Sequence, residues 1–161
     1  MTSFEEIYQR FFNKIENDRD FFVYFNVTDN EAIEIARKRA KDFLIESVTR
    51  LTLSCTPDVN FHDYSLEQER FNFELTGNEI ELLSSLMREE YFKRDLAKLK
   101  AFMHHFSTRD LNLFSPANER KTFIDMVEKI TEENDKNIKR YISIDRLTGK
   151  YKAINYAAYN K

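Results

Sequence analysis

Few side chains in this sequence have a type and spacing that could do chemistry. His62, His104 and His105 are the three histidines, and Cys55 is the single cysteine. Consecutive residues on a helix point about 100° apart, so His104 and His105 cannot readily share a metal ion. His62 has only Asp63 beside it, and Cys55 has no pattern that supplies a base and an orienting group. We therefore predict no metal, no cofactor and no enzymatic activity.

Three kinds of charged motif could suggest other chemistry, and each has a simpler interpretation. Gly149–Lys150 lacks the upstream glycine and the strand–loop–helix context of a phosphate-binding loop. The run ARKRAK, residues 36–41, spreads its cations over different sides of a helix, which favours a solvated face over a nucleic-acid patch. The carboxylate pairs in MREEY (87–91) and TEEND (131–135) have basic neighbours, so we interpret them as surface ion pairs.

The composition indicates one domain built mainly from helices. The chain has 161 residues, 42% hydrophobic and 33% charged, with only two glycines and two prolines. This scarcity of helix breakers favours long helices. The single cysteine suits a reducing compartment. No apolar run approaches the ~20 residues of a membrane span, and the acidic start MTSFEEIYQRF is unlike a secretory signal, so we expect no membrane partner.

Charge is divided unevenly along the chain. The net charge is −3, yet residues 136–161 contain seven Lys or Arg and one acid, a balance of +6. The preceding residues must therefore carry −9. An acidic body with a basic end indicates that the end meets something acidic, such as a neighbouring copy, another protein or DNA.

Start signals and apolar spacing predict two helices in the first third. Ser3 and Glu6 form a capping-box pattern before an apolar stripe that reaches residue 15. Thr28 and Glu31 repeat that pattern before a second, longer stripe. This second helix should end before Pro57, because the residue that precedes a proline avoids helical geometry.

Two longer helices are predicted in the second half. Thr76 and Glu79 begin the third, which could extend to about Phe106. Unbroken, it would be roughly 43 Å long, so it should either kink or project toward a partner. Its two apolar stripes predict that more than one side is covered. Ser115 and Pro116 give the fourth helix a clear N-cap and first turn, and its stripe ends at residue 141.

Three segments are less regular. Residues 21–25, FFVYF, fit either a short buried strand or an ordered loop. Residues 71–75 alternate Phe, Phe and Leu, which fits either a short strand or an extended lead-in to the next helix. The run TEENDKN, residues 131–137, interrupts the stripe of the fourth helix, and we expect it to be solvated. The fold prediction is mainly α: an antiparallel bundle of about four helices over residues 1–141.

The last segment, residues 142–161, is predicted to be a C-terminal β-hairpin or an extended docking tail. Isoleucines alternate before the turn DRLTG, and KYKAI could return as a second strand. An isolated hairpin is marginal in water, so the segment needs a surface to lie on. Tyrosines outside the helical stripes favour an interface. The residues predicted to contact a partner are Ile142, Ile144, Arg146, Lys150, Tyr151, Lys152, Ile154, Tyr156 and Tyr159.

The stretch from residue 73 to residue 141 resembles a family of small neck proteins from tailed phages and prophages of Gram-positive bacteria. The resemblance lies in the helix opening LTGNEIELLSSLM, the junction LFSPAN, and a charged last helix that ends in Tyr141. The first seventy residues match less distinctly, and the segment after Tyr141 departs from the family pattern.

This resemblance implies a structural virion protein, a head-to-tail connector or adaptor that is not an enzyme. Copies would form a ring, usually twelve-fold, beneath the portal protein and extend the channel through which DNA passes without specific binding. The ring would dock the next neck, head-closure or tail-terminator component. The implied location is the virion neck, after assembly in the host cytoplasm. The alternative is a DNA-binding or regulatory helical protein, prompted by ARKRAK and the basic end.

Overall fold

The computed structural model describes residues 1–18, 21–105 and 117–152. Within these residues it contains four helices and three very short strands. In chain order they are β1 (Thr2–Ser3), α1 (Phe4–Lys14), α2 (Asp29–Ser54), β2 (Tyr64–Ser65), β3 (Arg70–Phe71), α3 (Gly77–His105) and α5 (Ala117–Ser143). The prediction of a mainly helical fold is confirmed.

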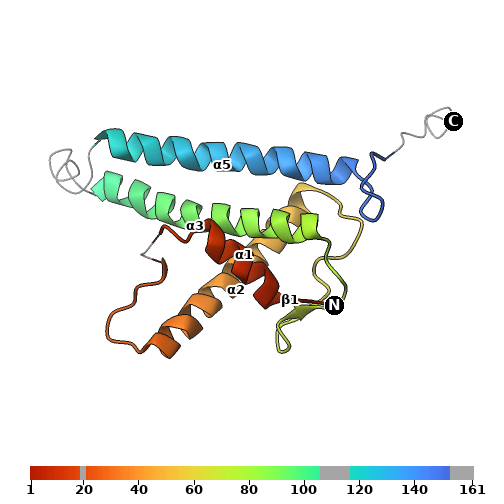
Figure 1. Cartoon of the computed structure of the whole chain (residues 1–161). Helices are drawn as coiled ribbons and strands as arrows, with labels where there is room; N and C mark the ends of the chain where they lie inside the picture. The colour runs from red at the N-terminus through yellow and green to blue at the C-terminus, as the bar shows by residue number, and fades with distance from the viewer. Residues whose placement is uncertain (19–20, 106–116, 153–161) are drawn as a thin grey trace.

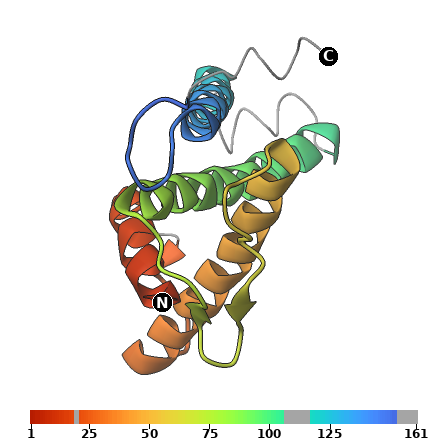
Figure 2. The same ribbon diagram turned by 90° about the vertical axis from the view of Figure 1, so that its right-hand side faces the viewer.

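Helix α3 is the central element of the fold. Helices α1 and α2 pack against one side of it, and α5 packs along the other (Figures 1 and 2). Helices α3 and α5 run antiparallel, whereas α1 and α2 cross α3 obliquely. More than one side of α3 is thus covered, as predicted, although Met103 of the second stripe is exposed. The helix is continuous from Gly77 to His105, and α5 packs along it.

Two of the predicted capping boxes are present. The Thr28 hydroxyl accepts from the Glu31 N–H at 3.4 Å, and the Glu31 carboxylate accepts from the Thr28 N–H at 2.8 Å. Thr76 and Glu79 exchange the same pair of bonds, at 3.3 and 2.7 Å. Each box satisfies backbone donors that the first helical turn leaves open.

The starts of the first and last helices do not show the full predicted caps in the described residues. Ser3 is the N-cap of α1, but its hydroxyl accepts from the Glu5 N–H at 3.2 Å and not from that of Glu6. The predicted cap Ser115 and first-turn Pro116 of the last helix lie outside the described residues. Helix α2 ends at Ser54, before the proline, as predicted.

The core is strongly aromatic. Phe11, Phe21, Phe43 and Tyr91 are buried together, with Phe21 at 5.5 Å from Phe11 and 5.4 Å from Tyr91 in nearly perpendicular arrangements. Edge-to-face geometry of this kind is the favourable one for aromatic rings. These side chains come from α1, α2, α3 and the α1–α2 connection, so one cluster joins the whole N-terminal half.

A small antiparallel sheet lies beside this core, with strand order β1–β3–β2. Phe71 pairs with both Thr2 and Tyr64, and it is fully buried. The Thr2 hydroxyl also accepts from the Leu75 N–H at 2.8 Å. The chain start is thereby held against the segment that leads into α3. Of the stretch 71–75, only Phe71 belongs to a strand, and the remainder leads into α3.

The segment over residues 21–25 is an ordered loop and not a strand. Phe21 is buried in the aromatic core, whereas Phe22, Val23 and Phe25 are exposed. Alternation of buried and exposed residues is absent within this segment, so the periodicity of a half-buried strand does not apply.

We expect Phe11→Ala to lower the free energy of unfolding by about 3–5 kcal/mol, because it leaves a cavity in the aromatic core. Phe25→Ala is the matched control: this ring is 87% exposed, so its removal should change stability by no more than about 0.5 kcal/mol. Urea unfolding followed by circular dichroism measures both. Similar losses from the two variants would contradict this assignment of the core.

Candidate functional site

The predicted partner-binding segment begins at the end of α5, and its first part is tied to the body of the protein. Arg146 Nε donates to Glu79 Oε1 at 2.6 Å, and the same guanidinium donates to the backbone carbonyl of Glu74. Lys152 Nζ lies 2.7 Å from a carboxylate oxygen of Asp58. Two cations of the segment therefore join it to the start of α3 and to the connection that follows α2.

Glu79 is the fully buried centre of this attachment. Besides capping α3 and pairing with Arg146, it accepts from the Tyr141 hydroxyl at 3.1 Å. Burial, followed by the negative charge of Glu79, raises the pKa of Tyr141, so the hydroxyl remains a donor. The hydrogen bond to Glu79 raises the pKa of Arg146. One carboxylate thus links the start of α3, the end of α5 and the following turn.

The turn after α5 has its own local bonds. The Asp145 carboxylate accepts from the Thr148 N–H and hydroxyl, both at 2.7 Å, and these bonds lower the pKa of Asp145. Gly149 has φ of +66°, a left-handed conformation that suits glycine. Ile144 and Tyr151 form one isolated antiparallel bridge. A single bridge does not establish two paired strands, so the hairpin remains a prediction.

The structure separates the predicted contact residues by exposure. Ile142 lies in the last turn of α5, so the expectation that it begins a strand is wrong: the helix continues through Ser143. Ile144 is partly buried, whereas Lys150 is exposed and Tyr151 is 78% exposed. The remaining predicted residues, Ile154, Tyr156 and Tyr159, lie outside the described residues.

A cavity of about 300 Å³ lies between the start of α3, the last turns of α5 and this turn. Its lining includes the polar side chains of Asn78, Ser85 and Asn137 together with the apolar ones of Leu82 and Ile144. Charged side chains line it as well, namely Glu81, Arg140, Asp145 and Arg146. The cavity therefore offers hydrogen-bonding groups and charges of both signs.

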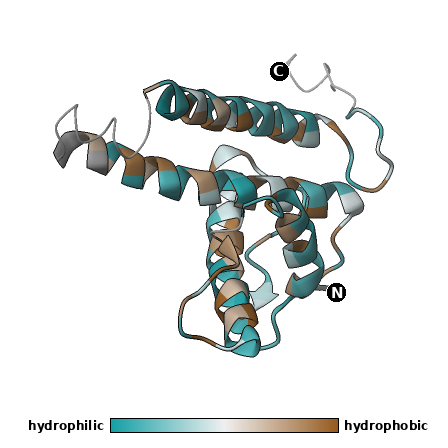
Figure 3. Cartoon of the chain, turned by 60° about the vertical axis from the view of Figure 1, so that its left-hand side comes forward, coloured by the Kyte–Doolittle hydropathy of each residue, from teal (hydrophilic) through white to brown (hydrophobic). Residues whose placement is uncertain are grey.

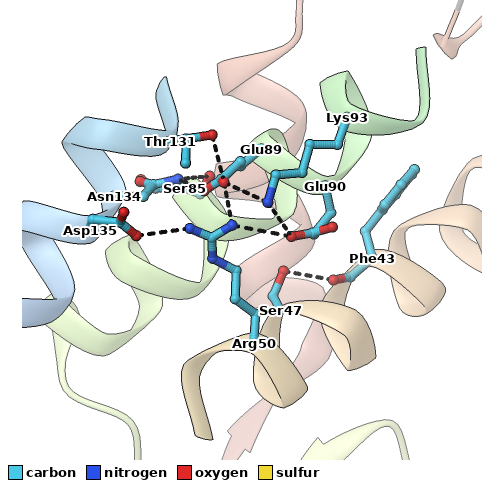
Figure 4. A network of polar contacts seen from close by, with 10 residues as sticks. All are labelled: Phe43, Ser47, Arg50, Ser85, Glu89, Glu90, Lys93, Thr131, Asn134 and Asp135. Atoms are coloured by element: carbon cyan, nitrogen blue, oxygen red, sulfur yellow. Dashed lines mark hydrogen bonds and ion pairs between the residues drawn. The ribbon is translucent and has the colours of Figure 1, made fainter. Parts of the chain in front are cut away.

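A second buried carboxylate, Glu89, joins three helices (Figure 4). It lies on α3, has no exposed side-chain surface, and pairs with Arg50 of α2 and, at 2.9 Å, with Lys93. From α5, Asn134 donates to it at 2.7 Å and Thr131 at 2.9 Å. The interpretation of MREEY as a surface ion pair is therefore wrong for Glu89.

Both cations and hydrogen bonds compensate the buried charge of Glu89. Burial alone would raise its pKa, but the bonds from Asn134, Lys93 and Thr131 and the charge of Arg50 together lower it. The carboxylate is therefore ionised at neutral pH. Its four partners come from α2, α3 and α5, so the ionised state holds these helices in one register.

The polar run 131–137 of α5 is also not wholly solvated, contrary to expectation. Asn134 is buried, and besides Glu89 its amide donates to the Ser85 carbonyl at 3.1 Å. The sequence did contain a signal for this. Ile130, Asn134 and Ile138 follow one another at four-residue spacing, so Asn134 occupies a position of the buried stripe. A polar residue at such a position needs a buried partner.

The residues considered for catalysis or metal binding have ordinary surroundings where the structure describes them. The Cys55 thiol donates to the Leu51 carbonyl at 3.3 Å, and burial raises its pKa, which disfavours the reactive thiolate. His62 Nε2 lies 3.2 Å from the Thr52 hydroxyl. Within residues 1–18, 21–105 and 117–152, no group of three or more His, Cys, Asp or Glu residues is placed to hold a metal ion.

The basic run ARKRAK is largely engaged in the fold. Arg37 pairs with Glu5 at 3.3 Å, and Lys41 pairs with Glu69 at 2.9 Å. The Arg39 guanidinium lies inward against the α1–α2 connection. Since three of its cations have partners on the same chain, the run does not form a free phosphate-binding surface.

Comparisons with known proteins found no matching family model, no matching curated protein and no matching solved structure. Of the helices in the described part of the chain, none is both long enough and apolar enough to cross a membrane. Function must then be inferred from two features of the molecule: the helical body held together by Glu79 and Glu89, and the basic segment attached to its end.

We expect Glu89→Gln to destabilise the protein by about 3 kcal/mol, because it leaves the cations of Arg50 and Lys93 beside a neutral amide. The folded-state pKa of Glu89 lies below its unfolded value, so its contribution is present above the unfolded pKa of about 4.3. That contribution is lost as pH falls through the lower, folded-state pKa. The stability gap between wild type and variant should therefore narrow in acid.

Denaturant unfolding at pH 7 and at several acidic pH values measures this gap. Glu132→Gln is the matched control, because Glu132 is exposed on α5 beside the same network. A gap that stays constant down to the acid limit of folding would show that the Glu89 charge is not the stabilising feature.

We expect Arg146→Ala to release the turn from the body, because Glu79 then loses its charged partner there. The amide hydrogens of Gly149 and Lys152 donate to the carbonyls of Asp145 and Ser143. They should exchange about tenfold faster, because the variant loses one hydrogen bond to a charged group. Hydrogen exchange with mass spectrometry measures this. Lys150→Ala, at an exposed position, should leave exchange unchanged; equal acceleration by both variants would argue against the Arg146 anchor.

Proposed function

We propose that this protein is a structural component of a phage or prophage virion, a head-to-tail connector of the neck. Copies assemble as a ring beneath the portal protein, extend the DNA channel and dock the next neck or tail component. The observation that carries the proposal is a helical body with a net negative sequence and a basic, tyrosine-rich end that begins at its surface.

A ring requires two unlike surfaces on each copy, which meet head to tail. Charge separation within one chain supplies such surfaces, since opposite potentials steer and orient the encounter. The C-terminal segment also has a defined point of departure. Arg146 and Lys152 attach it to the body through Glu79 and Asp58, and nine further residues follow. The tail of residues 142–161, hairpin included, is proposed to complete its structure on a partner, by strand addition or side-chain contact.

The central pair of helices suits a rigid ring subunit. Helix α3 has 29 residues and α5 has 27, so each is roughly 40 Å long. Glu89 locks this pair to α2 through partners on three helices. The resemblance of residues 73–141 to neck proteins covers this same pair. The DNA-binding alternative has weaker support, because Arg37, Arg39 and Lys41 are engaged within the fold.

The test is binding to the portal oligomer encoded by the same phage or prophage genome. Mixed with that portal, the full chain should form a closed ring of stoichiometric copies, as seen by native mass spectrometry or electron microscopy. A chain that ends at Lys152 should keep its helical content but assemble less well. Normal assembly without residues 153–161 would show that these residues are not needed for assembly, contrary to the proposal. Failure to bind portal, together with salt-sensitive binding to duplex DNA, would favour the DNA-binding alternative.

A further inference from the structure

The connection between α1 and α2 presents apolar side chains to solvent. Phe25 is 87% exposed and Val23 56% exposed, and Phe22 and Val27 are also exposed; Ile33 adds to them from the first turns of α2. Figure 3 shows this part of the molecule, where brown segments occur in the connection before α2. We call these five residues the apolar face. Large apolar side chains grouped on a surface mark an interaction site.

The apolar face has a defined shape. Arg39 donates to the Phe21 carbonyl at 3.2 Å and to the Tyr24 hydroxyl at 2.9 Å, and its guanidinium lies 4.3 Å from the centre of the buried Phe21 ring. Asn26 has φ of +61°, which turns the chain beside Phe25. Arg39 therefore fixes the loop to α2, and the side chains of Phe22, Val23 and Phe25 remain exposed to solvent.

The surroundings of the apolar face are acidic. Between residues 21 and 36, Asp29, Glu31 and Glu34 are all exposed, and the sequence of this stretch contains no Lys or Arg. Arg19 precedes this stretch in the sequence, and Arg37 and Lys38 follow it; Arg37 is paired with Glu5, and Lys38 is exposed. An occupant should therefore combine apolar or aromatic side chains with positive charge.

One segment of the chain itself has this character. Residues 150–161, KYKAINYAAYNK, contain three lysines, three tyrosines and no acid. Tyrosine supplies large contact area at a low entropic cost, and it is enriched in interfaces. Tyr151, the first of the three, is already 78% exposed. The aromatic content of the segment and the charges of Lys150 and Lys161 complement the apolar face, whereas Lys152 is paired with Asp58 of its own copy.

The geometry favours the segment of a second copy over that of the same copy. Lys152 follows the turn at the end of α5, whereas the α1–α2 connection lies at the opposite end of the molecule (Figure 1). The turn after α5 is also attached to its own copy, because Arg146 pairs with Glu79 of α3 and Lys152 pairs with Asp58. We infer that residues 150–161 of one copy bind the apolar face of the next copy, which deepens the proposed connector function and rests on it.

Photo-crosslinking between isotopically distinct copies tests this contact. In the full-length chain, Tyr156 is replaced by benzoyl-phenylalanine. Isotopically heavy and light copies of this chain are mixed, and the mixture is irradiated both without portal and with portal. Heavy–light cross-links should map to residues 21–36. Cross-links confined to one copy, heavy–light products on another surface, or no heavy–light product in either sample would each overturn the inference.

Matched surface variants add a second readout. Phe25→Ser should lower the yield of heavy–light cross-links about tenfold, because it removes a central aromatic contact. Glu34→Lys should also lower it, by reversing the local charge. Leu53→Ser is the control, since Leu53 is 84% exposed but lies at the end of α2; an equal effect of this variant would overturn the inference.

The inference and the proposed function can fail separately. Portal binding and normal ring formation, with cross-links outside residues 21–36, would overturn the proposed contact at the apolar face and leave the connector function intact. Heavy–light cross-links to residues 21–36 without any portal binding would establish the contact between copies and remove the connector function.

Discussion

The ionised carboxylate of Glu89 is buried where α2, α3 and α5 meet, and the packing of the helices depends on how its charge is compensated. A buried carboxylate without partners would take up a proton or open the structure to water. Here Arg50 and Lys93 supply charge, and Asn134 and Thr131 supply hydrogen bonds. Because the partners belong to three helices, a shift of any one helix along another breaks several bonds together. Burial of such a group contributes less to net stability than to the choice of one register.

Glu79 applies the same constraint at one end of the α3–α5 pair, where α3 begins and α5 ends. It accepts from Thr76, Tyr141 and Arg146, which come from the start of α3, the end of α5 and the following turn. The helix start and the attachment of the C-terminal segment are thereby coupled. A displacement of the turn therefore acts directly on the start of α3 through this carboxylate.

Local patterns were enough to predict most of the helical architecture. Thr28 with Glu31 and Thr76 with Glu79 are short-range signals, and the proline after α2 is another. The three-stranded sheet could not be assembled in the same way, because Thr2 and Phe71 pair across a sequence separation that no local pattern encodes. Glu89 was misassigned for a related reason: basic neighbours in sequence suggested exposure, while its burial depends on α2 and α5. Asn134, placed in an apolar stripe, was the available signal.

The C-terminal segment shows where local reasoning stops. Its turn chemistry follows from Asp145, Thr148 and Gly149, but its attachment depends on Glu79 and Asp58, which are distant in sequence. Of the seven cations behind the +6 balance, three lie on α5, and Arg146 and Lys152 are engaged with those acids, so two remain in the segment. In the docking that we propose for this segment, recognition relies on the aromatic side chains and on the lysines at positions 150 and 161. An apolar surface bordered by acids is then a better receptor than an acidic surface alone.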